Sequence, residues 1–181
     1  MSFKKIKIFA ITGSTRRNSS NYKILQFISE HIKPEFEVEI FEDLDTLPHF
    51  NPDLDTDSPP ERISFFRNKI VHADGIIICT PEYVFSLPGS LKNALEWCVS
   101  TTILSQKKVG LITASASGEM AHEQLILIMK TLEAKFDDEI LLLIQGVRGK
   151  INVKGKIVNN ETFVALQQFI EKFENQFLNE T

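Results

Sequence analysis

Short apolar runs alternate with amphipathic helical patterns along the whole chain, and this order restricts the possible folds more than any other feature. Four runs are rich in apolar residues, which is typical of strands buried on both faces: residues 5–11, 75–79, 109–113 and 140–144. Residues 36–40 instead alternate apolar side chains with glutamates. That alternation indicates a strand with one face in water, as at the edge of a sheet.

Helical patterns separate these strands and complete the alternation. Each predicted helix carries apolar residues at helical spacing, and the five helices cover residues 22–32, 63–71, 89–99, 119–135 and 163–177. Strand–helix alternation predicts an α/β protein with a parallel sheet and helices on both faces. With residues 36–40 at an edge, the strand order 2-1-3-4-5 fits best. No linker or repeat interrupts the pattern, so we predict one domain over residues 1–181.

Composition excludes several classes of protein. The net charge is −4, which favours neither a nucleic-acid partner nor an anionic membrane. No apolar stretch is long enough to span a bilayer, and the first residues lack the pattern of a signal peptide. Cys79 and Cys98 lie in apolar surroundings, as reduced and inert cysteines do. We therefore expect a cytoplasmic protein that contacts neither nucleic acid nor membrane.

Ligands of such sheets bind beyond the carboxyl ends of the strands, near the point where the strand order reverses. The first loop at this edge, residues 12–21, is rich in Gly, Ser and Asn and leads into a helix. A helix N-terminus attracts anions, and this loop adds side-chain donors. We predict a phosphate site formed by Ser14, Arg16, Ser19, Ser20 and Asn21. A plain helix cap, or a phosphorylation site at Ser19, would explain the same residues.

The second loop at this edge, residues 80–88, is stiffened by Pro81 and Pro88. A stiff loop holds backbone groups in place against the edge of a flat ring. We predict ring contacts, mostly through backbone, from Pro81, Glu82, Tyr83 and Val84. The alternative is a proline-rich entry to the next helix.

The third loop, residues 113–118, contains only small residues and is assigned to the far edge of the same ligand through Ser115, Ser117 and Gly118. Taken alone, this loop favours a simple small-residue turn between a strand and a helix.

Two of these loops resemble the motifs of the NADPH-dependent FMN reductase family. Residues 13–21 match G-S-x-R-x-x-S-x-N at every fixed position. Residues 81–97 resemble P-E-Y-N-x-S-x-P-G-x-L-K-N-A-I-D-W, with Leu95 and Glu96 as mild variants and with Val84 in place of the usual Asn. The family's Gly-Gly pair is missing after Gly118.

The resemblance implies a flavodoxin-like three-layer sandwich, bound FMN, and NADPH or NADH as co-substrate. It implies electron transfer to a small-molecule acceptor: a quinone, an azo compound, a metal oxyanion or free flavin. It also implies a homodimer or homotetramer, with the helix after Pro88 as a subunit contact. Because FMN carries the chemistry, we assign no catalytic acid or base. The alternatives are a flavodoxin-like electron carrier and an FMN-binding regulatory protein.

Metal and hydrolase sites have no support in the sequence. The four histidines are scattered, and no G-x-S-x-G nucleophile motif is present. Residues 43–60 form a long, proline-bearing polar segment that suits either a lid, a partner contact or a solvated crossing segment. Within it, Asp53, Asp55 and Asp57 lack the rest of a calcium-loop pattern, so we interpret them as a solvated acidic loop.

Overall fold

The structure, a computed structural model, describes residues 4–178 and contains one parallel sheet with the strand order β2-β1-β3-β4-β5. Its strands are β1 (Ile6–Thr12), β2 (Phe36–Phe41), β3 (Gly75–Thr80), β4 (Lys108–Ala114) and β5 (Leu141–Ile144). Exposure alternates along β2, the edge strand, whereas every residue of β3 is buried. The predicted fold class and strand order are confirmed.

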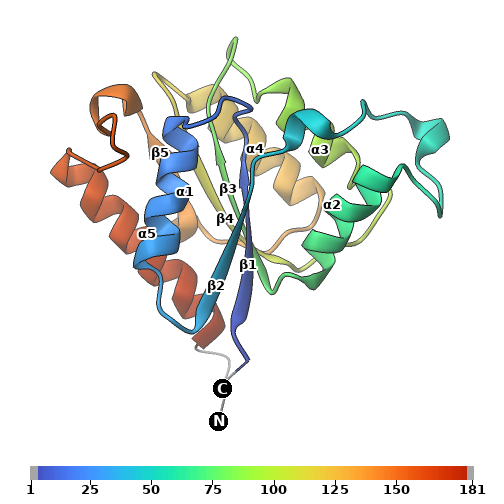
Figure 1. Ribbon diagram of the computed structural model, residues 1–181, viewed down its shortest axis with the longest axis horizontal. Helices are drawn as coiled ribbons and strands as arrows, with labels where there is room; N and C mark the ends of the chain where they lie inside the picture. Colours follow the sequence, from blue (N-terminus) through green and yellow to red (C-terminus); the bar gives the residue numbers. More distant parts are fainter. Residues whose placement is uncertain (1–3, 179–181) are drawn as a thin grey trace.

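Helices cover both faces of the sheet and make a three-layer sandwich (Figure 1). One face carries α1 (Ser20–His31) and α5 (Asn160–Leu178). The other carries α2 (Glu61–His72), α3 (Gly89–Glu96) and α4 (Glu119–Thr131). All the strands run the same way, so the loops that leave their carboxyl ends share one edge of the sheet.

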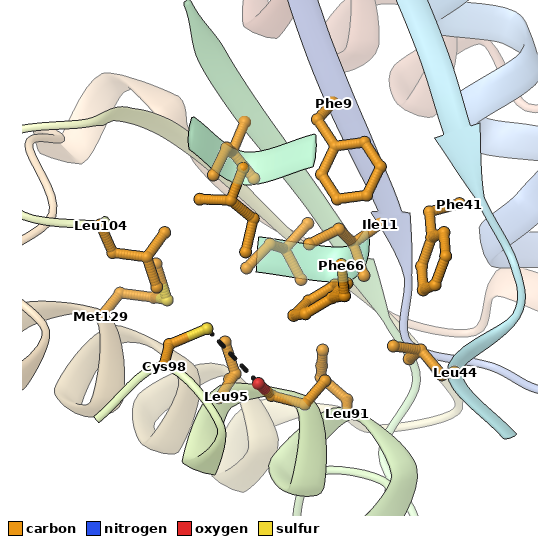
Figure 2. Close-up of a cluster of buried hydrophobic side chains, with 14 of the residues drawn as sticks. Phe9, Ile11, Phe41, Leu44, Phe66, Leu91, Leu95, Cys98, Leu104 and Met129 are labelled. Atoms are coloured by element: carbon orange, nitrogen blue, oxygen red, sulfur yellow. Dashed lines mark hydrogen bonds between the residues drawn. The ribbon is translucent and has the colours of Figure 1, made fainter. Parts of the chain in front are cut away.

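The side chains of each central strand divide between two cores, because successive strand residues point to opposite faces. Phe9 and Ile11 belong to the core beneath α2, α3 and α4, whereas Ile8 and Ala10 belong to the core beneath α1 and α5. Figure 2 shows the first core, in which the ring centroids of Phe9 and Phe41 lie 5.5 Å apart. Burial of this apolar surface is the main source of stability for the fold.

Two strand glycines make room for the aromatic side chains of α5. A Cβ atom on Gly75 would lie 2.5 Å from the Phe177 ring, and one on Gly110 would lie 2.6 Å from the Phe169 ring. Neither distance is possible for real atoms. The helix can therefore pack this closely only because positions 75 and 110 are glycine. The helix α5 thereby packs directly on the centre of the sheet.

Some predicted boundaries were wrong. The helix predicted for residues 119–135 ends at Thr131, because Glu133 takes a positive φ of 59° and Lys135 pairs with Lys108 beside β4. The helix predicted for residues 89–99 ends at Glu96, and turns follow it. Local propensity continues in both segments, but the chain must turn to enter the next strand.

The long segment between β2 and α2 is mostly exposed, but it is anchored to α3. Leu44 is buried, and the Pro48 carbonyl accepts hydrogen bonds from the side chains of Asn93 and Trp97, at 3.0 and 2.8 Å. The Asn93 side chain also accepts from the Phe50 amide at 2.7 Å. These contacts favour a packed crossing segment over a lid.

The prediction of a solvated acidic loop was wrong for Asp55. Asp53 and Asp57 are exposed, but the Asp55 carboxylate is only 6% exposed and pairs with Arg67 at 2.6 Å. Burial by itself raises the pKa of Asp55, but hydrogen bonds from Ser100 and Arg67 and the guanidinium charge outweigh it, so the pKa is lowered. This ion pair ties the long segment to α2.

Both cysteines are free thiols and buried, as predicted. Burial raises the pKa of the Cys98 thiol to about 12, so the reactive thiolate is absent at neutral pH. Within residues 4–178, no cluster of three His, Cys, Asp or Glu side chains could hold a metal ion. None of the helices described is both long and apolar enough to cross a membrane.

Candidate active site

A cavity of about 350 Å³ opens at the carboxyl edge of the sheet, where the loops after β1, β3, β4 and β5 meet. The strands β1 and β3 are neighbours there, and the chain leaves them toward opposite sides of the sheet (Figure 1). This divergence creates the crevice in which α/β proteins of this topology bind ligands.

The loop after β1 lies very close to β3 and then caps α1. A Cβ atom on Gly13 would lie 2.3 Å from Thr80 Oγ1, so only glycine fits, and the Gly13 amide donates to the Cys79 carbonyl at 2.8 Å. Ser19 has extended backbone angles, and its Oγ accepts from the Tyr22 amide at 3.1 Å. The sequence thus folds here into a tight turn with a capped helix start.

Several donors at this end of the cavity have no protein acceptor. The amides of Ser20 and Asn21, in the first turn of α1, make no hydrogen bond with the other described residues. Arg16 is exposed, lines the cavity and forms no ion pair within residues 4–178. The buried Thr12 Oγ1 also has no partner among these residues. Such uncommitted donors, with the positive end of the helix dipole, suit an anion.

The side chain of Asn21 also has a structural role, which the sequence motif did not indicate. Its side-chain Nδ2 donates to the Ala114 carbonyl at 3.3 Å, and its Oδ1 accepts from the Cys79 thiol at 3.3 Å. The side chain of Asn21 therefore joins the start of α1 to β3 and β4. Its backbone amide remains free for a ligand.

Glu82 joins the second loop to the third. Its two carboxylate oxygens accept hydrogen bonds from the amides of Gly118 and Ala121, at 3.1 and 3.0 Å. Gly118, with a φ of 92°, is the N-cap of α4, so Glu82 supplies the acceptor that this cap lacks. The Ser115 hydroxyl adds a 3.4 Å bond to the Glu82 carbonyl. The side chain of Glu82 is therefore committed to the protein, which leaves its backbone facing the cavity.

The tip of the second loop is a two-residue turn with unfavourable residues. The backbones of Tyr83 and Ser86 exchange two hydrogen bonds, at 3.0 and 3.1 Å, across Val84 and Phe85. These central residues have φ values of 52° and 55°, a geometry that favours Asn and Gly. Val84 is 94% exposed. The Gln124 side chain of α4 holds the turn by bonding the Phe85 carbonyl and the Ser86 hydroxyl.

A histidine lies behind the third loop. His122 Nδ1 is 2.9 Å from the hydroxyl of Thr113, near the end of β4. Burial lowers the pKa of His122, which keeps its imidazole neutral at pH 7. His122 does not line the cavity, so the structure gives it a supporting position behind the site.

The structure adds a fourth loop that the sequence did not reveal. After β5, the amides of Gly146 and Val147 donate to the carbonyls of Ala116 and Ser115, at 3.0 and 3.1 Å. This places Val147 and Arg148 in the cavity wall. The pattern of residues 145–156 is polar and irregular, and only the hydrogen bonds to the third loop bring it to the site.

Most of the predicted site residues meet in this cavity. Those that line it are Ser14, Arg16, Ser19, Ser20, Asn21, Pro81, Glu82, Tyr83 and Ser115. The predicted residues Val84, Ser117 and Gly118 do not line it, because Val84 points into solvent and Gly118 caps α4 behind the wall. Ala114, Ala116, Val147 and Arg148 line it without having been predicted.

The residues present fit FMN. One end of the cavity offers hydroxyls, free amides and Arg16, the donor set that a phosphate monoester requires. The other end offers the apolar surfaces of Pro81, Tyr83 and Val147, which suit a flat ring. The carboxylate of Glu82, the one acidic side chain in the lining, accepts hydrogen bonds from two backbone amides at the start of α4.

Fold and site together define a flavodoxin-like α/β protein with a cleft at the switch point of its sheet, whose free donors suit an anion. The chain belongs to the NADPH-dependent FMN reductase family, whose family model matches residues 6–145. The resemblance carried by the two sequence motifs is thereby confirmed. The protein is an NAD(P)H-dependent flavin enzyme with FMN as its cofactor.

Curated relatives match along most of their length. A 2-hydroxy-1,4-benzoquinone reductase from a Burkholderia species is 30% identical over 174 residues, which cover 93% of this chain and 94% of the relative. A subunit of an NADH:(hydroxy)cinnamate reductase from Vibrio ruber is 32% identical over 170 residues, covering 91% and 83%.

A solved structure shares the fold. It is the flavoenzyme FerB, an NAD(P)H:(acceptor) oxidoreductase from Paracoccus denitrificans, with a TM-score of 0.76 and 26% identity. The similarity covers 92% of this chain and 94% of that one.

Proposed function

We propose that residues 1–181 form a single FMN-binding domain that reduces a quinone-type small molecule with electrons from NAD(P)H. The observation that carries the proposal is the cavity itself, with uncommitted phosphate donors at one end and apolar ring surfaces at the other. Two of the relatives are named as reductases of quinones, which supports this class of acceptor.

The chemistry that bound FMN supplies is acceptance of a hydride from NAD(P)H and return of its two electrons to an acceptor. The chain's own part is to bind and orient. Arg16, the free amides of Ser20 and Asn21, and the hydroxyls of Ser14 and Ser19 hold the phosphate through charge-assisted and neutral hydrogen bonds.

The ring end is held by rigid backbone. Pro81 is buried, and Glu82 fixes the second loop to the third through its bonds to Gly118 and Ala121. A wall that does not rearrange on binding costs less ordering entropy and keeps the reacting faces aligned. We assign no acid or base to this wall, because its lining carboxylate is committed to two amides.

The experiment is reconstitution followed by turnover. Purified protein is titrated with FMN, and its visible spectrum is recorded before NADPH or NADH is added without oxygen. We expect one FMN per chain, loss of the flavin absorbance on adding a nicotinamide, and its return on adding a quinone. A protein that takes up no FMN would refute the proposal.

The same titration separates the enzyme from its alternatives. A carrier or regulatory protein would bind FMN and turn yellow, but neither nicotinamide would bleach it. FMN would satisfy the free donors around Arg16 in the enzyme, in a carrier and in a regulatory protein alike. Only reduction of the bound FMN by a nicotinamide distinguishes the enzyme from the other two.

We further propose a cytoplasmic homodimer or homotetramer with α3 at a subunit contact. The exposed part of α3 carries Lys92 and Glu96, which pair at 2.7 Å on its surface. The buried free thiols of Cys79 and Cys98 suit a reducing compartment. Light scattering coupled to size exclusion measures the assembly, and a monomer at micromolar concentration would contradict this part of the proposal.

A further inference from the structure

Arg148 is a second arginine in the cavity, and the phosphate loop does not need it. It comes from the loop after β5, whereas Arg16 comes from the loop after β1. The strands β3 and β4 lie between these two strands. At about 4.8 Å per strand, the ends of β1 and β5 are roughly 14 Å apart. The two guanidinium groups therefore belong to different loops of the cavity wall.

The backbone around Arg148 is held firmly. Val147 is 5% exposed and bonds the Ser115 carbonyl, and Gly146 adopts a positive φ of 60° that lets the chain turn there. Arg148 itself is exposed and forms no ion pair within residues 4–178. An arginine whose backbone is fixed in a cavity wall, but whose charge is unpaired, is prepared to receive an anion.

Arg148 belongs to a basic segment of the chain. Residues 140–160 contain four basic residues and no acidic one, in a chain whose net charge is −4: Arg148, Lys150, Lys154 and Lys156. The family model ends at residue 145, so this basic segment lies outside the matched part of the family. Of these four, Arg148 alone lines the cavity, whereas Lys154 and Lys156 line a separate pocket beside α1.

The FMN phosphate does not account for Arg148. A phosphate monoester carries one to two negative charges, and Arg16, the α1 dipole and the free amides already face that end. Arg148 is therefore free to hold a second anion in the same cavity. NAD(P)H has phosphates to offer, and many quinone-type acceptors carry an acidic substituent.

We propose that Arg148 forms a second anion subsite of this cavity, which binds a negatively charged group of a substrate other than FMN. The inference rests on the proposed function, since it assigns part of the substrate's recognition to that same site. The shared chemistry is an anion, and its source is either a phosphate of the dinucleotide or an acid group of the acceptor.

The experiment compares Arg148→Ala and Arg148→Glu with Lys154→Ala. Lys154 lies in the same basic segment and is exposed, but it does not line the cavity, so it controls for lost charge. FMN affinity is measured by fluorescence titration, and binding of a redox-inert tetrahydro analogue of NADPH by calorimetry. Turnover uses NADPH, NADH and N-benzyl dihydronicotinamide, which has no phosphate, with a neutral naphthoquinone and its sulfonated analogue.

We expect Arg148→Ala to lower kcat/KM about tenfold for the anionic substrate, and Arg148→Glu to lower it further. A loss with NADPH and NADH but not with N-benzyl dihydronicotinamide, together with weaker binding of the inert analogue, identifies the dinucleotide. A loss confined to the sulfonated quinone identifies the acceptor. Both losses shrink as salt is raised.

The inference is overturned if Arg148→Ala matches the unmodified protein with every substrate, if Lys154→Ala loses as much, or if only FMN affinity falls. Failure of the proposed function looks different. The unmodified protein would then take up no FMN or oxidise no nicotinamide, and that result precedes any comparison of variants.

Discussion

Val84 is a β-branched residue in a turn that favours Asn or Gly, and its replacement should stabilise the protein. Its φ of 52° is a left-handed conformation, which costs a β-branched residue about 1–3 kcal/mol. The side chain is 94% exposed, so Val84→Asn removes almost no buried apolar surface. Asn tolerates this conformation, and we expect a gain of about 1 kcal/mol in the free energy of unfolding.

The assay is urea unfolding at 25 °C, with thermal melting as a second measure. For a chain of this size, a gain of about 1 kcal/mol raises Tm by about 2–4 °C. Both measurements are made on apoprotein and again with saturating FMN, because a bound ligand adds its own stabilisation. Val84→Gly should gain less, since glycine loses more backbone entropy on folding.

The matched control is Val153→Asn. Val153 is 92% exposed, and it is not among the residues with a positive φ. Its replacement should change stability by less than about 0.5 kcal/mol. If Val84→Asn is no more stabilising than Val153→Asn, the turn stores no strain at Val84 and the reasoning fails.

Three further substitutions test other parts of the structure. Glu82→Gln leaves one capping amide without an acceptor, and should lower the free energy of unfolding by about 1–2 kcal/mol in urea melts; an unchanged midpoint would show that the cap is not needed. Gly110→Ala forces a Cβ atom against Phe169 and should cost about 1–3 kcal/mol by the same assay, whereas a neutral result would mean that α5 shifts freely. Asp55→Asn leaves Arg67 with an unpaired buried charge and should cost about 3 kcal/mol at pH 7. Because the folded-state pKa of Asp55 is lowered, this stabilisation is complete above the unfolded-state pKa of about 3.9 and is lost as the pH falls through the folded-state pKa. The difference between this variant and the unmodified protein should therefore shrink below about pH 4, and a constant difference down to pH 2 would contradict the lowered pKa.

The strand order was predictable because a simple physical rule applies to each strand. A strand buried on both faces is apolar throughout, as β3 is, whereas an edge strand such as β2 alternates. Topology then follows from the connections, since helices between parallel strands leave few arrangements. The helix ends were less predictable, because they depend on contacts distant in the sequence. The turn at Glu133, for example, is fixed by the pairing of Lys135 with Lys108 of β4.

The phosphate end of the site was predictable for a different reason. Its donors lie within one short loop, so their spacing in the sequence is also their spacing in space. Arg148 and Asp55 show the opposite case. Arg148 reaches the cavity only through hydrogen bonds between its loop and the third loop, and Asp55 is buried only by its contact with Arg67. Neither contact leaves a pattern in the local sequence.

Glu82 shows that a motif residue has more than one possible task. Its place beside two ring-binding positions suggested a ligand contact, yet its carboxylate caps α4. Glu82 lines the cavity, and its side chain bonds to the protein. Whether the side chain of a motif residue contacts a ligand or caps a helix depends on groups far away in the sequence, here the amides of Gly118 and Ala121.

The most direct test of the central claim is a comparison of FMN with riboflavin, which lacks the phosphate. We expect the protein to bind FMN at least about a hundredfold more tightly, because the loop around Arg16 contributes only when a phosphate is present. Arg16→Ala should narrow that ratio about tenfold, and Arg17→Ala, which does not line this cavity, should leave it unchanged. Equal affinities for FMN and riboflavin in the unmodified protein would contradict the account.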